Sequence, residues 1–197
     1  QRQMCIRDRL YPKVTYEVME GGGKIVENLT ETDEVDIGIT TLPVDATLFH
    51  SVPLYNEELL LVVSKDHALA QQEKVDLAEL KEEEFVLFHD DYYLKDQIIE
   101  NCKRLGFYPK TVANISQISF IANMISQGIG ISVVPESLVH LMGDNVKALK
   151  LENAELSWHL GLIWRRDAYL NFVTREWIQF IRDLRAVSYT HLRAHET

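Results

Sequence analysis

The chain has 197 residues, of which 46% are hydrophobic and 25% are charged, and its formal net charge at pH 7 is −10. This length can bury a sizeable core, in one domain or in two small lobes. The acidic balance makes the chain by itself a poor nucleic-acid binder, because the phosphate backbone repels negative charge. The longest apolar run, residues 59–63, has the length of a strand, so we expect no membrane contact.

The two ends of the chain differ from the sequence between them. The first nine residues, QRQMCIRDR, and residues 186–197, which contain VSYTHLRAHET, carry no apolar period that fits their neighbours. Both strings resemble translated sequencing adapters, and such segments are excluded from fold reasoning. The alternative is a natural frayed tail at each end. On the adapter interpretation the native part is 10–185, and its net charge is −12 because the first string carries +2 and the last carries 0.

The cysteines indicate the compartment. Cys5 belongs to the first string, which leaves Cys102 alone in the native part. One cysteine forms neither an intrachain disulfide nor a cysteine-based zinc site, and it suits a reducing compartment. We therefore expect a cytoplasmic protein.

Apolar periods predict strands that alternate with helices along the whole native part. In the N-terminal third we expect a strand at 14–18, a helix after the glycines at 21–23 with Ile25, Val26 and Leu29 on its buried face, a strand at 35–39 and an extended stretch over 49–63. Next come a short helix at 77–80, a strand at 85–88, a helix at 94–105 and a strand at 111–115. A helix at 116–127 and a strand at 130–134 follow, and Gly106 and Gly128 are expected to end the two longer helices. A short helix from Pro135, strands at 146–151 and 157–164 and a helix at 170–184 complete the set. This alternation implies βαβ units and a mostly parallel sheet.

Five stretches carry a resemblance through their order and spacing: YPKVTYEVMEGGG, VDIGITT, LYNEELLLVVSKDHALA, NISQISFIANMISQGIGISVVPES and LSWHLGLIWRRD. Together they resemble the effector-binding domain of LysR-type transcriptional regulators. The resemblance implies an α/β fold of two Rossmann-like lobes joined by two crossover strands, similar to type 2 periplasmic binding proteins. Lobe I would hold 10–64 and 157–185, lobe II would hold 65–156, and the crossovers would lie at 58–64 and 157–164. It also implies that the first strand of lobe I is missing here.

The function that the resemblance implies is the sensing of a small molecule. The chain would bind a small polar effector in the cleft between its lobes and thereby control transcription, with DNA bound only through a missing N-terminal helix-turn-helix. Expected partners are the effector, further copies of the chain in a homodimer or homotetramer, and RNA polymerase as a further candidate. The helix at 24–31 and the strand after it would contribute to the contact between copies. The alternative is a solute-binding protein of a transport system, which shares the two-lobed fold.

Four joints at strand ends are candidate ligand contacts, because ligands of open parallel sheets bind outside the carboxyl ends of strands, often at helix starts. At the first joint, Gly22 and Gly23 offer bare amides at a helix start, although the glycines are equally well explained by a tight turn. At the second joint, Thr40 and Thr41 place two hydroxyls where packing requires none. The alternative for both threonines is ordinary polarity at a strand end.

The third joint follows the first strand of the predicted lobe II. It contributes Asp91, Tyr92 and Tyr93, of which the rings are better ligand candidates than the carboxylate. The alternative is that Asp90 or Asp91 caps the helix that follows.

The fourth joint precedes the helix at 116–127. Ser116, Gln117 and Ile118 would present amides and a hydroxyl to the ligand, and Ser116 is alternatively a plain helix N-cap. By resemblance all four joints face the cleft. We expect the ligand to be an organic anion rather than a sugar. Lys24 and Lys95 are the only cationic side chains in these segments, so mainly amides and hydroxyls would hold the anion. The candidate ligand-binding residues are Gly22, Gly23, Thr40, Thr41, Asp91, Tyr92, Tyr93, Ser116, Gln117 and Ile118.

No motif of the sequence indicates catalysis, a cofactor or a metal. The sequence contains no GxGxxG, no Walker loop, no GxSxG and no HExxH. The histidines are scattered singly, and Cys102 lies within a predicted helix without a neighbouring base, which favours a buried thiol over a nucleophile. We therefore expect no catalytic residue, no cofactor and no metal, which disfavours an enzyme built on the same bilobal fold.

Overall fold

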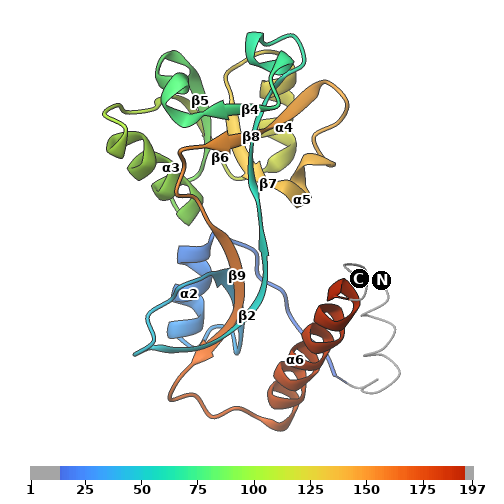
Figure 1. Cartoon of the computed structure of the whole chain (residues 1–197). Helices are drawn as coiled ribbons and strands as arrows, with labels where there is room; N and C mark the ends of the chain where they lie inside the picture. The colour runs from blue at the N-terminus through green and yellow to red at the C-terminus, as the bar shows by residue number, and fades with distance from the viewer. Residues whose placement is uncertain (1–13, 194–197) are drawn as a thin grey trace. The chain divides into compact units, whose positions relative to one another are not determined.

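The computed structural model describes the backbone of residues 14–193 and the side chains of residues 14–182. The chain divides into two units, which are described separately below. The larger unit, Gly22–Arg166, contains every described strand and the helices α2 to α5, and the smaller one contains residues 14–21 and α6 (Phe172–Arg193) (Figure 1). None of the helices in the described part of the chain is long and apolar enough to span a membrane.

The helix α6 begins close to the position that the sequence predicts. The Asn171 side chain accepts a hydrogen bond from the Thr174 amide at 2.9 Å, which satisfies one of the free donors at the helix start. The Trp177 and Phe180 rings, three residues apart on the helix, meet edge to face with centroids 6.1 Å apart. The helix continues to Arg193, beyond the expected end at 184 and into the segment interpreted as an adapter. The first adapter-like string and residues 194–197 lie outside the described residues.

Three antiparallel strands form the sheet of the first lobe of the larger unit. Their order is β1 (Gly38–Thr41), β9 (Trp158–Arg165), β2 (Phe49–Glu57), and α2 (Gly23–Glu31) packs against β1 and β9. Gly38 marks the close approach of the helix, since a Cβ there would lie 2.6 Å from Val26 Cγ1. At the start of α2, a Cβ on Gly23 would lie 2.7 Å from Thr40 Oγ1, so the first two candidate joints are neighbours.

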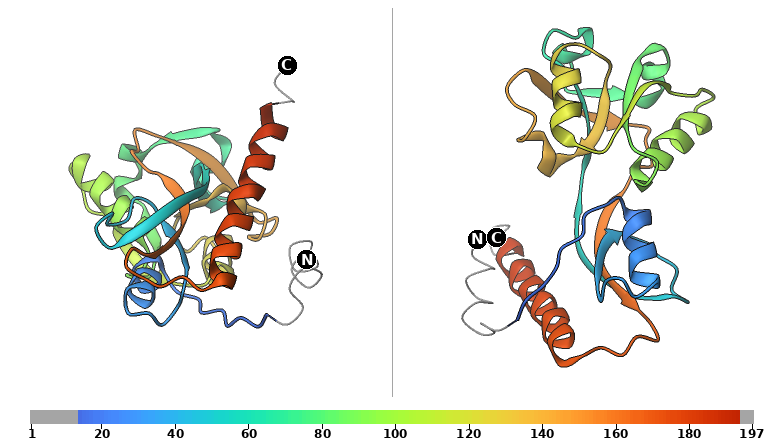
Figure 2. Two further views of the ribbon diagram at one scale, coloured as in Figure 1. Left: turned by 90° about the horizontal axis from the view of Figure 1, so that it is seen from below. Right: turned by 180° about the vertical axis from the view of Figure 1, so that it is seen from behind.

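The chain passes between the two lobes at two places. The strand β2 leads across Glu58 directly into β3 (Leu59–Ser64), and the segment after β8 (Val146–Glu152) leads back into β9 (Figures 1 and 2). The two passages run in opposite directions, which is why β2 and β9 pair antiparallel.

A mixed sheet forms the second lobe. Its main part has the order β4 (Lys74–Asp76), β8, β3, β7 (Ser132–Pro135), and the parallel pair β5 (Glu84–Phe88) and β6 (Lys110–Ile115) joins it through a parallel bridge between Phe85 and Ile131. The helical elements of this lobe are η1 (Ala68–Gln71), η2 (Leu77–Glu82), α3 (Tyr93–Arg104), α4 (Ile118–Ser126) and α5 (Glu136–Val139).

The hydrophobic core of the second lobe holds the loops of the third and fourth joints in place. Its fully buried side chains come from strands and helices alike, for example Leu61, Phe85, Leu94, Ile121 and Leu149. Each side chain of this kind contributes about 1.5–3 kcal/mol through its burial. The loops that follow β5 and β6 are therefore anchored by a well-packed core.

The predicted helices at 24–31, 94–105 and 116–127 are confirmed to within a few residues. Gly106 follows α3 with φ +85°, and Gly128 follows α4 with φ +74°. This left-handed backbone suits glycine and ends both helices as the sequence predicts.

Three predictions about strands and faces are wrong. Residues 14–18 form no strand, and Val18 is 77% exposed, because alternation produces a strand only where a partner strand pairs with it. On α2, Ile25 is 42% exposed, whereas the predicted buried face included it. The described sheets are not mostly parallel, since β3 and β9 pair antiparallel with their neighbours.

Cys102 should resist thiol reagents in the folded protein. Its side chain is fully buried on α3, and burial raises the pKa of its thiol to about 11, so the reactive thiolate is scarce at neutral pH. In a Cys5→Ser variant, Ellman's reagent should react with Cys102 at least about a hundredfold more slowly in buffer than in 6 M guanidinium chloride. Equal rates in the two solutions would show that Cys102 is accessible in the native chain.

Candidate functional site

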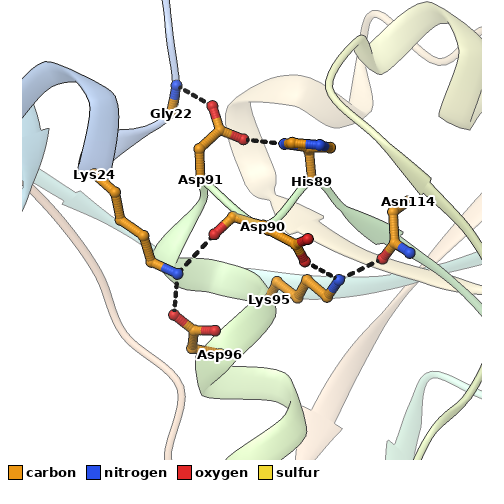
Figure 3. Close-up of polar contacts among 8 residues, drawn as sticks. All are labelled: Gly22, Lys24, His89, Asp90, Asp91, Lys95, Asp96 and Asn114. Atoms are coloured by element: carbon orange, nitrogen blue, oxygen red, sulfur yellow. Dashed lines mark hydrogen bonds and ion pairs between the residues drawn. The ribbon is translucent and has the colours of Figure 1, made fainter.

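The start of α2 lies against the loop between β5 and α3, so the first and third candidate joints meet (Figure 3). The Gly22 amide donates to Asp91 Oδ2 at 2.8 Å, and the Lys24 amide donates to the Asp91 carbonyl oxygen at 3.1 Å. Gly22 is the N-cap of α2 and has no side chain to cap it. The Asp91 carboxylate therefore caps α2 from the other lobe, where the helix dipole favours a negative charge.

Only glycine fits at position 22. A Cβ there would lie 2.4 Å from the carbonyl oxygen of Asp91, which is backbone and cannot move aside cheaply. The absent side chain thus allows the two lobes to touch, which is a more specific reason for glycine than a tight turn.

His89 orients the Asp91 carboxylate. The two side chains are joined by a 2.7 Å hydrogen bond between His89 Nδ1 and Asp91 Oδ1, in which the imidazole N–H donates. Burial, the largest single influence, would raise the pKa of Asp91. The hydrogen bonds that its carboxylate accepts, from His89 first and then from Gly22, outweigh burial, and the pKa of Asp91 is lowered. The carboxylate is therefore ionised at neutral pH and can only accept hydrogen bonds.

Two lysines surround the same contact (Figure 3). Lys24 Nζ donates to the Asp90 carbonyl oxygen at 2.6 Å and forms an ion pair with Asp96 at 2.6 Å. Lys95 binds the Asp90 carboxylate and Asn114 Oδ1, the latter at 2.7 Å. The Lys24–Asp96 pair is substantially exposed, so water and salt screen much of its energy.

A second contact between the lobes centres on Glu27. Tyr93 donates its hydroxyl hydrogen to Glu27 Oε2 at 2.8 Å, and the buried Thr40 hydroxyl donates to Glu27 Oε1 at 3.1 Å. Burial, and next the hydrogen bond to Glu27, raise the pKa of Tyr93 to about 12, which keeps its hydroxyl protonated as a donor. Glu27 lies one helical turn after Gly23, and that spacing on the same helix face was the signal by which the sequence could have identified it.

The structure brings together five of the ten predicted site residues, Gly22, Gly23, Thr40, Asp91 and Tyr93. Thr41 is buried next to Thr40 at the end of β1 and pairs with Leu160 of β9. Tyr92 packs on Phe88, with ring centroids 5.2 Å apart, and partly joins the second-lobe core.

The fourth joint stays apart from this group. Within residues 14–182 no hydrogen bond links Ser116, Gln117 or Ile118 to it; Ser116 and Gln117 are exposed, and Ile118 packs on the second-lobe core.

Two capping predictions are wrong. The N-cap of α4 is Gln117 rather than Ser116, and no side chain caps that helix. The N-cap of α3 is Tyr92 rather than Asp90 or Asp91, again without a side-chain hydrogen bond. Asp91 caps α2 instead, a contact between residues 69 positions apart that no local pattern could indicate.

No described group of three or more histidine, cysteine, aspartate or glutamate side chains is placed to hold a metal ion. The ionisable residues that gather at the start of α2 instead bind one another and the backbone. The side chains and backbone amides of this group can donate hydrogen bonds to a polar molecule that displaces one of these contacts, or accept hydrogen bonds from it.

Two α/β lobes with two chain passages between them define a ligand-binding domain of the type 2 periplasmic-binding-protein-like fold. Residues 8–186 match the family model described as the LysR substrate binding domain, and the chain belongs to this family. It is thus an effector-binding domain of the LysR family, whose members are transcriptional regulators rather than enzymes.

The similar curated proteins are bacterial regulators. The uncharacterized HTH-type transcriptional regulator YwbI of Bacillus subtilis is 37% identical over 170 residues, which cover 86% of this chain and 56% of that protein. The transcriptional dual regulator GltC of the same organism is 27% identical over 128 residues, covering 64% of this chain and 43% of that protein. The chain therefore spans about half the length of the curated relatives that it matches.

Solved structures share the fold at low identity. The effector-binding domain of QuiR in complex with shikimate superimposes with a TM-score of 0.82 at 20% identity, over 94% of this chain and 88% of that one. The regulatory domain of CcmR from Synechocystis PCC6803, in complex with 2-PG, has a TM-score of 0.84 at 15% identity, over 93% of this chain and 89% of that one.

Proposed function

We propose that the chain senses a small polar metabolite, an organic anion rather than a sugar, that binds between its two lobes and thereby controls transcription. The observation that carries the proposal is the group of Gly22, Gly23, Thr40, Asp91 and Tyr93, in which helix amides and hydroxyls from both lobes meet. Backbone amides at a helix start favour negative charge. The ligands named for the QuiR and CcmR domains support a small polar effector for this fold.

The rest of the regulator follows as part of the same proposal. A helix-turn-helix outside these 197 residues would bind DNA in a cytoplasmic homodimer or homotetramer, with RNA polymerase as a further partner. Ile25 of α2 and Ile39 of β1, which are exposed apolar side chains, support a contact between copies at these elements. The domain organisation proposed is lobe I at 10–64 and 157–185, lobe II at 65–156, and adapter-derived strings at 1–9 and 186–197.

Binding controls transcription only if the effector prefers one arrangement of the lobes. An effector that bridges both lobes shifts their equilibrium by its differential affinity for the two arrangements. One that binds both arrangements equally would shift nothing.

The test is a thermal-shift screen of carboxylic acids, amino acids and sugars, followed by titration of each hit against Thr40→Val and Tyr93→Phe, one variant from each lobe. Loss of one hydrogen bond to a charged ligand should weaken binding about tenfold or more in each variant. The matched control is Thr111→Ala, which removes an exposed hydroxyl of β6 and should leave the affinity unchanged. A panel without hits, or a hit that binds both variants as well as the parent chain, would contradict the proposed site.

A further inference from the structure

Three of the hydrogen-bond donors that the proposed function assigns to an effector are already occupied by the protein itself. The Gly22 amide is bound to the Asp91 carboxylate, and the Thr40 and Tyr93 hydroxyls are both bound to the Glu27 carboxylate. Each carboxylate thus stands where the acidic group of an effector would accept the same hydrogen bonds. An organic anion cannot engage these donors while both carboxylates remain in place.

These contacts also join the two lobes. Gly22, Lys24 and Glu27 belong to the α2 side, and Asp90, Asp91 and Tyr93 belong to the β5–α3 side. The first amides of a helix have no acceptor within the helix, and the first intrahelical bond of α2 runs from Val26 to the Gly22 carbonyl oxygen. The bonds of the Gly22 and Lys24 amides therefore depend on the other lobe.

The helix α3 connects this contact to one of the two chain passages. Its first residue, Tyr93, binds Glu27. About two turns later, the buried Asn101 side chain accepts the Glu155 amide hydrogen at 2.7 Å and donates to the Glu155 carbonyl oxygen at 3.2 Å. Gln97 accepts the Ser157 amide hydrogen at 2.9 Å, directly before β9. One rigid helix thus touches both the inter-lobe contact and the segment about which the lobes would turn.

We propose that these residues form an autoinhibitory latch, in which Asp91 holds the lobes together in the absence of effector and is displaced when an anionic effector binds. The latch consists of Gly22, Lys24, Glu27, Asp91, Tyr93 and the backbone carbonyl group of Asp90. The proposal rests on the proposed function for the identity of the displacing molecule, but the latch itself is testable without any effector. Release of the latch frees α3 to move with the segment that leads into β9.

The first test measures amide hydrogen exchange by NMR in the full chain and in Asp91→Ala. Removal of the carboxylate takes away the acceptor of Gly22 directly, so the informative reporter is the Lys24 amide, whose acceptor is a backbone oxygen that the substitution keeps. If Asp91 holds the lobes together, the Lys24 amide should exchange about tenfold faster or more in Asp91→Ala. Asp90→Ala is the matched control, because the Asp90 side chain hydrogen-bonds to Lys95, whereas the latch uses the Asp90 backbone oxygen, which the substitution keeps.

Unchanged exchange of α4 amides in Asp91→Ala shows that the second lobe remains folded. If the Gly22 amide exchanges faster and the Lys24 amide does not, Asp91 only caps the helix, and the latch is overturned. Faster exchange at Lys24 in Asp90→Ala to the same extent would also overturn it, since the effect would then be one of surface charge.

The second test uses any organic-acid hit from the thermal-shift screen. Because Asp91 competes with the effector, Asp91→Ala should bind that compound several-fold more tightly than the parent chain does. Weaker or equal binding would overturn the displacement by effector. A screen without hits would count against the proposed function alone, and the exchange result would still decide whether the latch exists.

Discussion

Phe85→Ala should lower the free energy of unfolding of the chain by about 3–5 kcal/mol, the range typical of a large cavity left in a packed core. Phe85 is fully buried at the centre of the second-lobe core, and its backbone bridges to Ile131, so the neighbours are held in place and cannot collapse into the cavity. The measurement is urea denaturation followed by circular dichroism in the full chain.

Phe120→Ala is the matched control for this prediction. The Phe120 side chain on α4 is 60% exposed, so the same chemical deletion should change stability by less than about 1 kcal/mol. A loss below about 1 kcal/mol for Phe85→Ala as well would show that the core around β5 is loosely packed.

Gly130→Ala should destabilise the chain by about 2–5 kcal/mol, because two costs combine at this position. The backbone of Gly130 has φ +74°, which L-residues adopt with difficulty, and a Cβ there would lie 2.6 Å from the Glu84 carbonyl oxygen. That oxygen accepts the Ile131 amide hydrogen at 2.7 Å, so moving it away breaks the bridge between β5 and the segment before β7.

Gly128→Ala separates the two costs. Gly128 has the same φ of +74°, but no atom lies within 4 Å of the Cβ that alanine would add. It should therefore cost only about 1–2 kcal/mol, the backbone part alone. Equal losses in the two variants in urea denaturation would mean that the approach to Glu84 is not tight in solution.

Local chemistry predicted most of the secondary structure correctly. The apolar periods of α3 and α4, and the glycines that follow them, are properties of short stretches, and both helices occur where the sequence predicts them. The failure at 14–18 has the opposite cause, because a strand needs a partner and alternation does not supply one.

The candidate site shows the same division. That Thr40, Asp91 and Tyr93 lie at or just after strand ends follows from the sequence, and the general rule for ligand sites at strand ends selected them without knowledge of their contacts. The same rule selected Gly22, although the strand expected before it at 14–18 does not form. Glu27 was missed, since the two hydroxyls that bind it come from different lobes, and its only local sign is its position one helical turn after Gly23.

The sequence by itself determined the family, the two-lobed fold class and the approximate positions of most helices and strands, because these depend on residues close together in the chain or on a pattern of stretches in order. Only the tertiary structure decided which helix Asp91 caps. The local expectation was that Asp91 caps α3, which follows it in the chain. However, the N-cap residue of α2, Gly22, has no side chain of its own to cap the helix, and it lies against the loop between β5 and α3 that carries Asp91. A carboxylate binds whichever free amides lie nearest in space, and that choice is made by the packing of elements far apart in sequence.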